Sequence, residues 1–378
     1  FGHGEGLGGY GGGARSKAHE PTGRSGDAKP PYNRTRERPP QNTGSRVCAM
    51  TVLVTGGAGF IGTHLVPRLV ARGDAVRVFD LRAPRAPVAR VDYRQGCITD
   101  TDAVRAAMVG CEQVFHLAAL SGMWAPDKSR FVHVNEIGTR TVLNEALRAG
   151  VGRVVHTSTE SILIATRGVE RPQRIDETTA QPEREMAGAY CRGKWRAEQV
   201  AWRAVAAGQD VVVVNPTIPI GPGDPWQTPA SRMLLGFLDA RFPAYLDSTI
   251  NLVDVRDVAD AHLAAAERAQ PGERCLVSGQ DLDFGTLIGR LAEVSGRELR
   301  FRRIPYAAAY AVAVVSEFLS DHLTRRPPAA PLTGVRIARI PVEFDNRRTR
   351  MRLGWSPRPL DQTLSDAIAD FEARGWLA

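Results

Sequence analysis

The chain has 378 residues, 43% of them hydrophobic and 24% charged, and carries a formal net charge of +8. These values are ordinary for a globular protein of more than one domain, and they exclude a wholly disordered, collagen-like or coiled-coil chain. No uncharged apolar run is long enough to span a membrane, and no signal segment is predicted at the start. The five cysteines are scattered without a CxxC pair, so we expect a reduced, cytoplasmic compartment, no disulfide framework and no metal site.

Residues 1–49 are rich in glycine and proline and hold eight basic and four acidic residues. We expect a disordered, solvated tail here, and the alternative is a basic arm that binds RNA or anionic lipid. The remaining positive charge is spread too thinly over the chain to indicate a nucleic-acid surface, so no nucleic-acid partner is expected.

Order is predicted to begin at Met50. The apolar β run 51–55 is followed by a glycine-rich turn, a helical pattern over 64–72 and a second β run over 75–80. This succession is a βαβ unit.

Strands and helices continue to alternate after this unit. Further strands are expected over 91–93, 113–117, 153–158 and 210–215, and helices over 102–109, 132–149 and 187–207. Apolar strands separated by helices predict a parallel sheet covered on both faces, that is, a doubly wound α/β fold of the Rossmann type. Residues 251–257 and 274–278 are predicted to return to this sheet.

The predicted domain division follows from these elements. After the tail, residues 50–215 plus 251–278 form the NAD(P)-binding Rossmann domain. Residues 216–250 plus 279–378 form a smaller, mixed C-terminal substrate-binding domain.

The turn Gly56–Gly62 (GGAGFIG) has the position of a dinucleotide phosphate cradle, after a strand and before a helix. Gly56 allows the tight turn, Gly59 lets the backbone approach a pyrophosphate, and Gly62 lets the helix pack closely on the strand. With Phe60 and Ile61, these residues are the predicted phosphate-binding set. The alternative is a plain turn.

Asp80 ends the second predicted strand, 18 residues after Gly62. A carboxylate at this point binds the ribose 2′-hydroxyl and repels a 2′-phosphate. NAD is therefore the expected cofactor. NADP is the alternative, because Arg82 and Arg85 follow closely and can bind that phosphate.

Tyr190 and Lys194 stand four residues apart near the start of a predicted helix and therefore share one face. A nearby ammonium and a cationic nicotinamide lower the pKa of a tyrosine, whose phenol then exchanges a proton with a substrate hydroxyl while hydride moves at the same carbon. Lys194 can also bind the nicotinamide ribose. The chain has only four lysines, so a chance pairing is rare, and the alternative is a structural lysine.

The preceding strand ends on hydroxyl residues, at the sheet edge where ligands bind. Thr159 is expected to polarise the substrate oxygen, and Ser158 is the second choice. The alternative is that these hydroxyls cap the backbone.

The glycine motif and the Tyr–Lys pair resemble the extended branch of the short-chain dehydrogenase/reductase superfamily, over Met50–Leu377. The resemblance implies that Leu117, Ala118 and Ala119 lie beside the nicotinamide half of the cofactor. It also implies that Asn135 corresponds to the asparagine that family members carry on a helix, and that Asn135 is one of the catalytic residues.

The resemblance extends to the adenine site and to the substrate site. It implies that Ile98 packs on the adenine, although Cys97 replaces an expected acid. Asn215 and Pro216 match the Asn-Pro of family epimerases, in which the asparagine approaches a substrate phosphate and the proline borders the cofactor. Arg232 is a candidate for further phosphate charge.

The same comparison bears on the reaction type. Sugar-nucleotide dehydratases have Thr-Asp-Glu where this chain has Thr159, Glu160 and Ser161. Ser161 cannot replace the glutamate base, so dehydration is not expected.

The segments 215–224 and 251–257 resemble hopanoid-associated sugar epimerases, a subgroup similar to dihydroflavonol 4-reductases. The implied activity is NAD(P)-dependent epimerisation by hydride transfer, on a small-molecule substrate of the nucleotide-sugar class. The alternatives are an NAD(P)H-dependent reductase of a dihydroflavonol-, steroid- or aldehyde-like substrate and a non-catalytic dinucleotide-sensing protein. Family members commonly pair, which implies a homodimer.

Residues 307–323 form an apolar stretch with helical periodicity. It is too short and too polar to span a membrane, so we expect a core or lid helix. The alternative is a lipid-facing lid that makes peripheral membrane contact.

Overall fold

The computed structural model describes residues 50–167, 172–242, 244–328 and 330–377. The predicted tail, residues 1–49, lies outside these ranges. None of the helices in the described ranges has the length and apolar character needed to cross a membrane. The same residues contain no group of three or more His, Cys, Asp or Glu side chains placed to bind a metal ion.

A parallel sheet forms the centre of the described chain, with strand order β11-β7-β5-β4-β1-β2-β3. Its seven strands are β1 (Thr51–Thr55), β2 (Ala75–Asp80), β3 (Asp92–Gln95), β4 (Gln113–His116), β5 (Arg153–Thr157), β7 (Val211–Pro216) and β11 (Arg274–Val277). The doubly wound α/β fold predicted from the sequence is confirmed.

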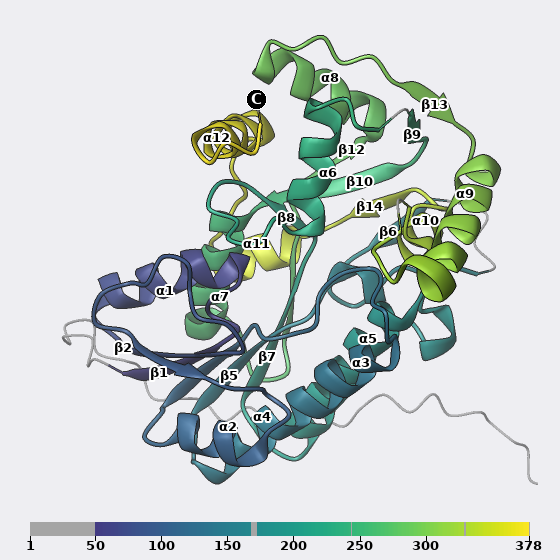
Figure 1. The fold of residues 1–378 in the computed structure, drawn as a ribbon. Coiled ribbons are helices and arrows are strands. Elements are labelled where there is room, and N and C mark those ends of the chain that lie inside the picture. Colours follow the sequence, from purple (N-terminus) through teal and green to yellow (C-terminus); the bar gives the residue numbers. More distant parts are fainter. Residues whose placement is uncertain (1–49, 168–171, 243, 329, 378) are drawn as a thin grey trace, which may run out of the picture. The chain divides into compact units, whose positions relative to one another are not determined.

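Helices cover both faces of this sheet (Figure 1). The helices α1 (Phe60–Arg72) and α7 (Val255–Arg268) pack together on one face, and the other face is covered by α2 (Thr101–Met108), α4 (Gly138–Arg148) and α5 (Ala189–Ala206). Two short elements precede α4, namely α3 (Ser129–Val132) and a π-helical turn, η1 (His133–Ile137).

The strands are apolar throughout because both of their faces are buried. Successive side chains of β1 show this: Val52 and Val54 join the core under α1 and α7, whereas Leu53 joins the core under α2 and α4. Residues Val211–Val214 of β7 divide in the same way and have no exposed surface. This alternation explains why the strands have no polar face in the sequence.

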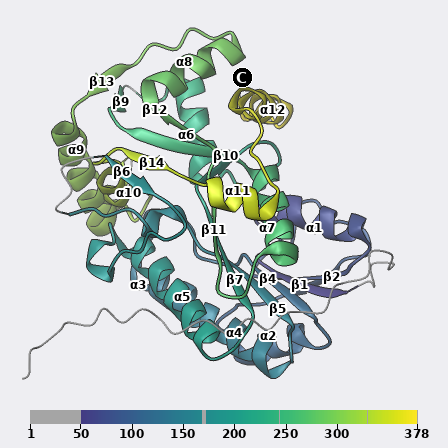
Figure 2. The same ribbon diagram turned by 180° about the vertical axis from the view of Figure 1, so that it is seen from behind.

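The direction of winding reverses between β1 and β4. From β1 the chain proceeds to β2 and β3 on one side, then returns to β4 and continues to β5, β7 and β11 on the other. Figure 2, seen from behind, shows β7 and β11 together on this second side. Loops that follow β1 and β4 diverge at such a point and leave a crevice for ligands.

Smaller sheets and helices follow β7. A three-stranded sheet of order β12-β10-β8 consists of β8 (Ile218–Ile220), β10 (Thr249–Asp254) and β12 (Gln280–Asp283). The helices α6 (Pro229–Leu238), α8 (Phe284–Ser295) and α12 (Leu360–Ala373) supply much of its separate apolar core. The other elements are β6 (Gln173–Ile175) with β14 (Val342–Phe344), β9 (Ala244–Leu246) with β13 (Arg302–Ile304), α9 (Tyr306–Leu319), α10 (Leu332–Ile337) and α11 (Arg347–Leu353).

Residues 251–257 were predicted to return to the main sheet, and this prediction is wrong. β10 instead pairs with β8 in parallel and with β12 antiparallel. The edge beside β7 is occupied by β11, as predicted for residues 274–278. At Asp254 the side chain accepts a hydrogen bond from the Arg256 amide, which caps α7 and ends the strand. The division into two domains stays a prediction.

Candidate active site

The glycine turn after β1 contacts the segment after β4 at the point where the winding reverses. Gly56 has a φ of 74°, and a Cβ at this position would lie 2.5 Å from the backbone nitrogen of Ala118. A Cβ at Gly62 would lie 2.4 Å from the carbonyl oxygen of Gly57. Both positions therefore require glycine, the first for conformation and contact and the second for the packing of α1 on the turn.

The amino end of α1 is open toward this turn. Gly59 is the N-cap, and no side chain caps the helix. The amides of Phe60, Ile61 and Gly62 lie in the first turn, where they have no partner within the helix. These N–H groups and the helix dipole form a site for a phosphate anion.

Asp80 fixes the turn from the end of β2. Its Oδ2 accepts a hydrogen bond from the Ala58 amide at 3.0 Å, and its Oδ1 accepts one from the Arg82 amide at 3.0 Å. The guanidinium groups of Arg82 and Arg85 both stack on the Trp226 ring, at 4.8 and 4.4 Å from its centroid. A carboxylate thus lies at the turn, while the two arginines predicted as the alternative phosphate ligands contact an indole.

Asn135 holds the loop that follows β4. Its Oδ1 accepts from the Leu120 amide at 2.7 Å, and its Nδ2 donates to the Leu120 carbonyl at 3.1 Å. Both ends of the amide are therefore occupied by the backbone. Asn135 thus holds the loop that begins at Leu117 and Ala118, and its predicted place in the catalytic set stays a prediction.

Ile98 lies under the start of α4. It is buried, and a Cβ at Gly138 would lie 2.4 Å from its Cδ1. The thiol of Cys97 lies 3.1 Å from the Thr99 hydroxyl. The predicted contact of Ile98 with an adenine ring stays a prediction.

Tyr190 and Lys194 lie on the first turns of α5, beside the end of β5. Lys194 is buried, and its Nζ donates to the Thr157 carbonyl at 2.7 Å. The ring of Phe131 packs edge-on against Tyr190 with centroids 5.9 Å apart. A Cβ at Gly193 would lie 2.5 Å from the Phe131 carbonyl, so this glycine allows α3 to approach the tyrosine.

The electrostatics of this pair differ from our expectation. Burial, followed by the nearby Glu160 charge, raises the pKa of Tyr190 above its ordinary value. Burial lowers the pKa of Lys194 to about 8. Without the cofactor, desolvation dominates at the phenol and Lys194 binds the Thr157 carbonyl. The predicted lowering of the Tyr190 pKa, which also requires the cationic nicotinamide, stays a prediction.

Thr159 is paired with a carboxylate that our sequence analysis did not place in the site. The Thr159 hydroxyl donates to Glu160 Oε2 at 2.7 Å and lies 3.2 Å from the Ser161 hydroxyl. Glu160 is buried, and this burial raises its pKa to about 7. The apolar run 162–164 that follows Glu160 was the available signal that this carboxylate is desolvated.

Ser158 is a second hydroxyl at the same strand end. Its amide donates to the Val214 carbonyl at 2.7 Å. Its hydroxyl is buried and, among the described residues, has no hydrogen-bond partner. It is therefore free to bind a ligand, whereas the Thr159 hydroxyl is engaged.

Asn215 does not have the environment of a phosphate ligand. It has no exposed surface, and its Nδ2 donates to the Thr159 carbonyl at 3.0 Å and to Glu198 Oε2 at 2.9 Å. The remaining amide atom, Oδ1, is an acceptor that a phosphate repels. Arg232 is exposed and binds the Gln227 carbonyl. This environment does not favour the predicted contact of Asn215 with a substrate phosphate, and that contact and the cofactor contact of Pro216 both stay predictions.

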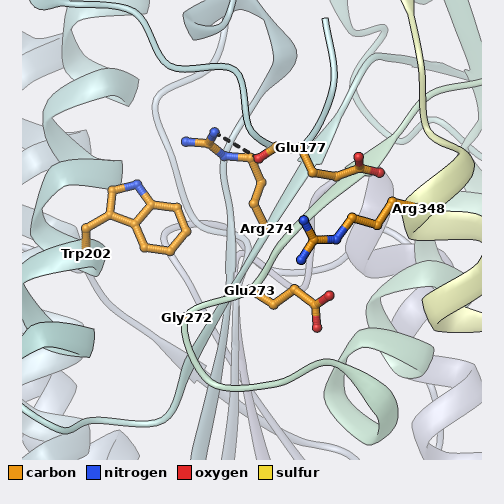
Figure 3. Close-up of a pocket in the computed structure, with 6 residues that line it drawn as sticks. All are labelled: Glu177, Trp202, Gly272, Glu273, Arg274 and Arg348. Atoms are coloured by element: carbon orange, nitrogen blue, oxygen red, sulfur yellow. Dashed lines mark hydrogen bonds between the residues drawn. The ribbon is translucent and has the colours of Figure 1, made fainter. Parts of the chain in front are cut away.

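Glu198, the partner of Asn215, belongs to a charged network that reaches β11. Arg274, the first residue of β11, binds Glu198 and lies over the Trp202 ring at 5.3 Å. Figure 3 shows Arg274 and Trp202 in a pocket of about 320 Å³ that also contains Glu177. None of the predicted site residues lines this pocket.

The chain matches known proteins over most of its length. Residues 52–277 match the model of the NAD dependent epimerase/dehydratase family. A Synechocystis sp. protein with a provisional dihydroflavonol 4-reductase name is 34% identical, with 86% of this chain and 95% of that protein covered. Sterol demethylase protein B of Methylococcus capsulatus is 31% identical, with 87% and 100% covered.

Solved structures agree in fold. The crystal structure of gox2253 has a TM-score of 0.74 and 30% identity, with 87% of this chain and 99% of that chain covered. A dTDP-glucose 4,6-dehydratase from Streptomyces venezuelae, solved with NAD, has a TM-score of 0.69 and 23% identity, with 87% and 99% covered. At that identity the second likeness concerns the fold alone.

Proposed function

The chain belongs to the NAD-dependent epimerase/dehydratase family, and from this premise we propose that it is an NAD(H)-dependent oxidoreductase. It interconverts a secondary alcohol and a ketone on an apolar substrate that carries no phosphate. This choice replaces nucleotide-sugar epimerisation, which our sequence analysis placed first, with its reductase alternative.

The environment of Asn215 is the observation that carries this choice. Its two amide hydrogens bind the Thr159 carbonyl and Glu198, and its free atom is an acceptor. A phosphate finds no donor there, and freeing one breaks a buried hydrogen bond to a charged group. Asn215 thus serves to hold the strand end at Thr159 in place.

The names of some relatives fit an apolar substrate, although cinnamoyl-CoA reductases are also among the relatives. The proteins that are more than 30% identical include the sterol demethylase protein B and a ketoreductase of a farnesyl-dihydroquinoline oxide from Stigmatella aurantiaca. The structures whose titles name nucleotide-sugars are 21–24% identical, which supports the fold and not the substrate.

The residues of the first half of the chain fit NAD. The glycine cradle, the open end of α1 and the Asp80 carboxylate hold its pyrophosphate and the adenosine ribose. When bound, the cofactor supplies hydride exchange at the carbinol carbon. Arg82 and Arg85 are engaged with Trp226, and this contact supports NAD over NADP.

The proton chemistry belongs to Tyr190. Its hydroxyl gives a proton to the carbonyl oxygen during reduction and takes it back during oxidation. The Ser158 or Thr159 hydroxyl orients that oxygen. Lys194 donates a hydrogen bond to the Thr157 carbonyl. Its ammonium places positive charge on the same face of α5 as Tyr190 and binds the nicotinamide ribose.

A substrate panel tests the proposal. The purified chain is incubated with NAD⁺ or NADH and with a dihydroflavonol, a hydroxysteroid and ketosteroid pair, a 3-oxoalkanoate and several nucleotide-sugars, while NADH absorbance and product stereochemistry are followed. We expect cofactor turnover with an apolar alcohol or ketone, and no conversion of any nucleotide-sugar. Inversion of a nucleotide-sugar without net cofactor turnover contradicts the proposal.

A further inference from the structure

Helix α9 and the π-helical turn η4 (Ser320–Thr324) that extends it carry a row of large apolar side chains that the rest of the described protein leaves uncovered. Their spacing of three or four residues places them on one face. The members of this apolar face are Val312, Val315, Phe318, Leu319 and Leu323, which are 54%, 59%, 59%, 41% and 71% exposed. α9 lies at the periphery in both Figures 1 and 2. A face of this kind marks an interaction surface.

The acidic residues of the same segment point the other way. Residues 306–324 contain two carboxylates, Glu317 and Asp321. Lys128 binds Glu317 Oε1 and Asp321 Oδ2, both at 2.6 Å. Trp124 Nε1 donates to Asp321 at 2.7 Å, and the Leu332 amide donates to Glu317 at 2.9 Å. Both carboxylates are thus bound to the protein, and the apolar face carries no negative charge.

Positively charged residues lie before and after the segment 306–324 in the chain. Arg302 precedes α9 and Arg326 follows η4, and both are exposed. In the described ranges neither arginine has an ion-pair partner. Residues 306–324 extend for about 28 Å at the usual helical rise, so two free cations flank a long apolar centre.

We propose that α9 and η4 dock this protein on an anionic lipid surface. The apolar side chains can insert at the boundary between lipid headgroups and acyl chains, where they leave water. The flanking arginines can then bind the phosphates of the anionic lipids. The alternative is that a second copy of the chain covers the apolar face. The charges of the arginines disfavour such a dimer. In either a parallel or an antiparallel two-fold pairing, like-charged ends meet and the face offers no carboxylate to neutralise them.

The segment formed by α9 and η4 contacts protein on both sides of the candidate active site. Lys128 and Trp124 belong to the segment after β4. On the other side, α9 packs on α10, where a Cβ at Gly188, the N-cap of α5, would lie 2.1 Å from the Thr333 hydroxyl oxygen. Docking therefore brings the segments on both sides of Tyr190 near the lipid surface, where an apolar substrate resides. This last step rests on the proposed function, whereas the docking itself does not.

Vesicle sedimentation of the full chain tests the docking. The probes are vesicles of phosphatidylcholine alone and vesicles with added phosphatidylglycerol. We expect binding to the anionic vesicles that weakens with salt. Val315→Asn/Phe318→Asn lowers the affinity at least about tenfold, and Arg302→Gln/Arg326→Gln lowers it about 25-fold. The control Val109→Asn/Met351→Asn changes two side chains that are 66% and 79% exposed, one after α2 and one on α11, and leaves binding unchanged.

The design separates the alternatives. Residues 1–49 are present in every variant, so a basic tail cannot explain a loss of binding in Val315→Asn/Phe318→Asn. Thermal unfolding of each variant confirms that the fold is intact. Docking is overturned if the wild type binds no vesicle, if this variant binds as tightly as wild type, or if sedimentation equilibrium shows a dimer that the same variant dissociates. Because vesicle binding is measured without substrate, failure of the proposed function leaves this result intact.

Discussion

The Thr159 hydroxyl donates a 2.7 Å hydrogen bond to Glu160 Oε2, and both side chains are buried beside Tyr190. Burial raises the pKa of Glu160 to about 7. The pair therefore changes state near neutral pH. Below this pKa the protonated acid can donate to Thr159, whose own proton becomes available for a substrate oxygen. Above it the carboxylate accepts the hydrogen bond of the Thr159 hydroxyl, and its charge raises the pKa of Tyr190.

Glu160→Gln is expected to remove an inflection near pH 7 from the rate of ketone reduction. In wild type the rate falls as pH rises through about 7, whereas the amide resembles the protonated acid at every pH. The measurement is kcat between pH 6 and 8. Ser161→Ala, which removes the other neighbour of the Thr159 hydroxyl, is the control and keeps the inflection. The same midpoint in wild type and Glu160→Gln assigns the titration to another group.

Tyr190→Phe is expected to lower kcat by about two orders of magnitude or more, because proton transfer to the substrate oxygen is lost. NADH binding, followed by fluorescence titration, is retained. Tyr93→Phe removes a phenol that accepts from the Val88 amide at the far edge of the sheet, and it leaves kcat nearly unchanged. Full activity in Tyr190→Phe rules out this residue as the acid.

The preference between NAD and NADP is expected to depend on Asp80. Wild type binds NADH more tightly than NADPH, because the carboxylate at the turn repels a 2′-phosphate. Asp80→Ser lowers the ratio of the NADH affinity to the NADPH affinity by about tenfold or more, which is the effect of one hydrogen bond to a charged group. Calorimetric titration with both cofactors checks the ratio, with the exposed Asp102→Ser as control. Tighter binding of NADPH by wild type means that Arg82 or Arg85 leaves Trp226 and governs the site.

Local patterns in the sequence predicted much of the fold and part of the site. The β1–α1–β2 unit, its glycines and the Tyr190–Lys194 pair are readable because their residues are neighbours in the chain. Residues 251–254 were assigned to the wrong sheet because an apolar run predicts a strand and not its partner. The role of Asn215 depends on Glu198, which lies on another element and meets β7 only in the folded chain.

The stability of the protein is expected to fall as pH drops below about 6.5. His116 and His262 are fully buried, and burial lowers their pKa values to about 3 and about 4. Burial also lowers the pKa of His156 well below its ordinary value. Below about pH 6.5 the unfolded chain binds protons that the folded chain does not. At pH 5 this lowers the free energy of unfolding by about 2 kcal/mol per histidine.

Urea unfolding between pH 7.5 and 5 checks this prediction. In the described ranges neither ring nitrogen of His156 has a hydrogen-bond partner. His156→Leu should therefore remove the contribution of one histidine from the pH dependence of the unfolding free energy. The substitution of an exposed histidine, His133→Leu, should leave that pH dependence unchanged. An unfolding free energy that is constant over this range shows that the three rings reach water.

The most direct test of the proposed function is the transfer of label from NADH that carries deuterium at both C4 positions. The chain is incubated with this cofactor and with the apolar ketone that the panel identifies. We predict one deuterium on the carbinol carbon of the product for each NADH consumed, and labelled product from Tyr190→Phe at about a hundredth of the wild-type rate or less. A nucleotide-sugar that is inverted with no NADH consumed and no deuterium gained would contradict the oxidoreductase and restore the epimerase.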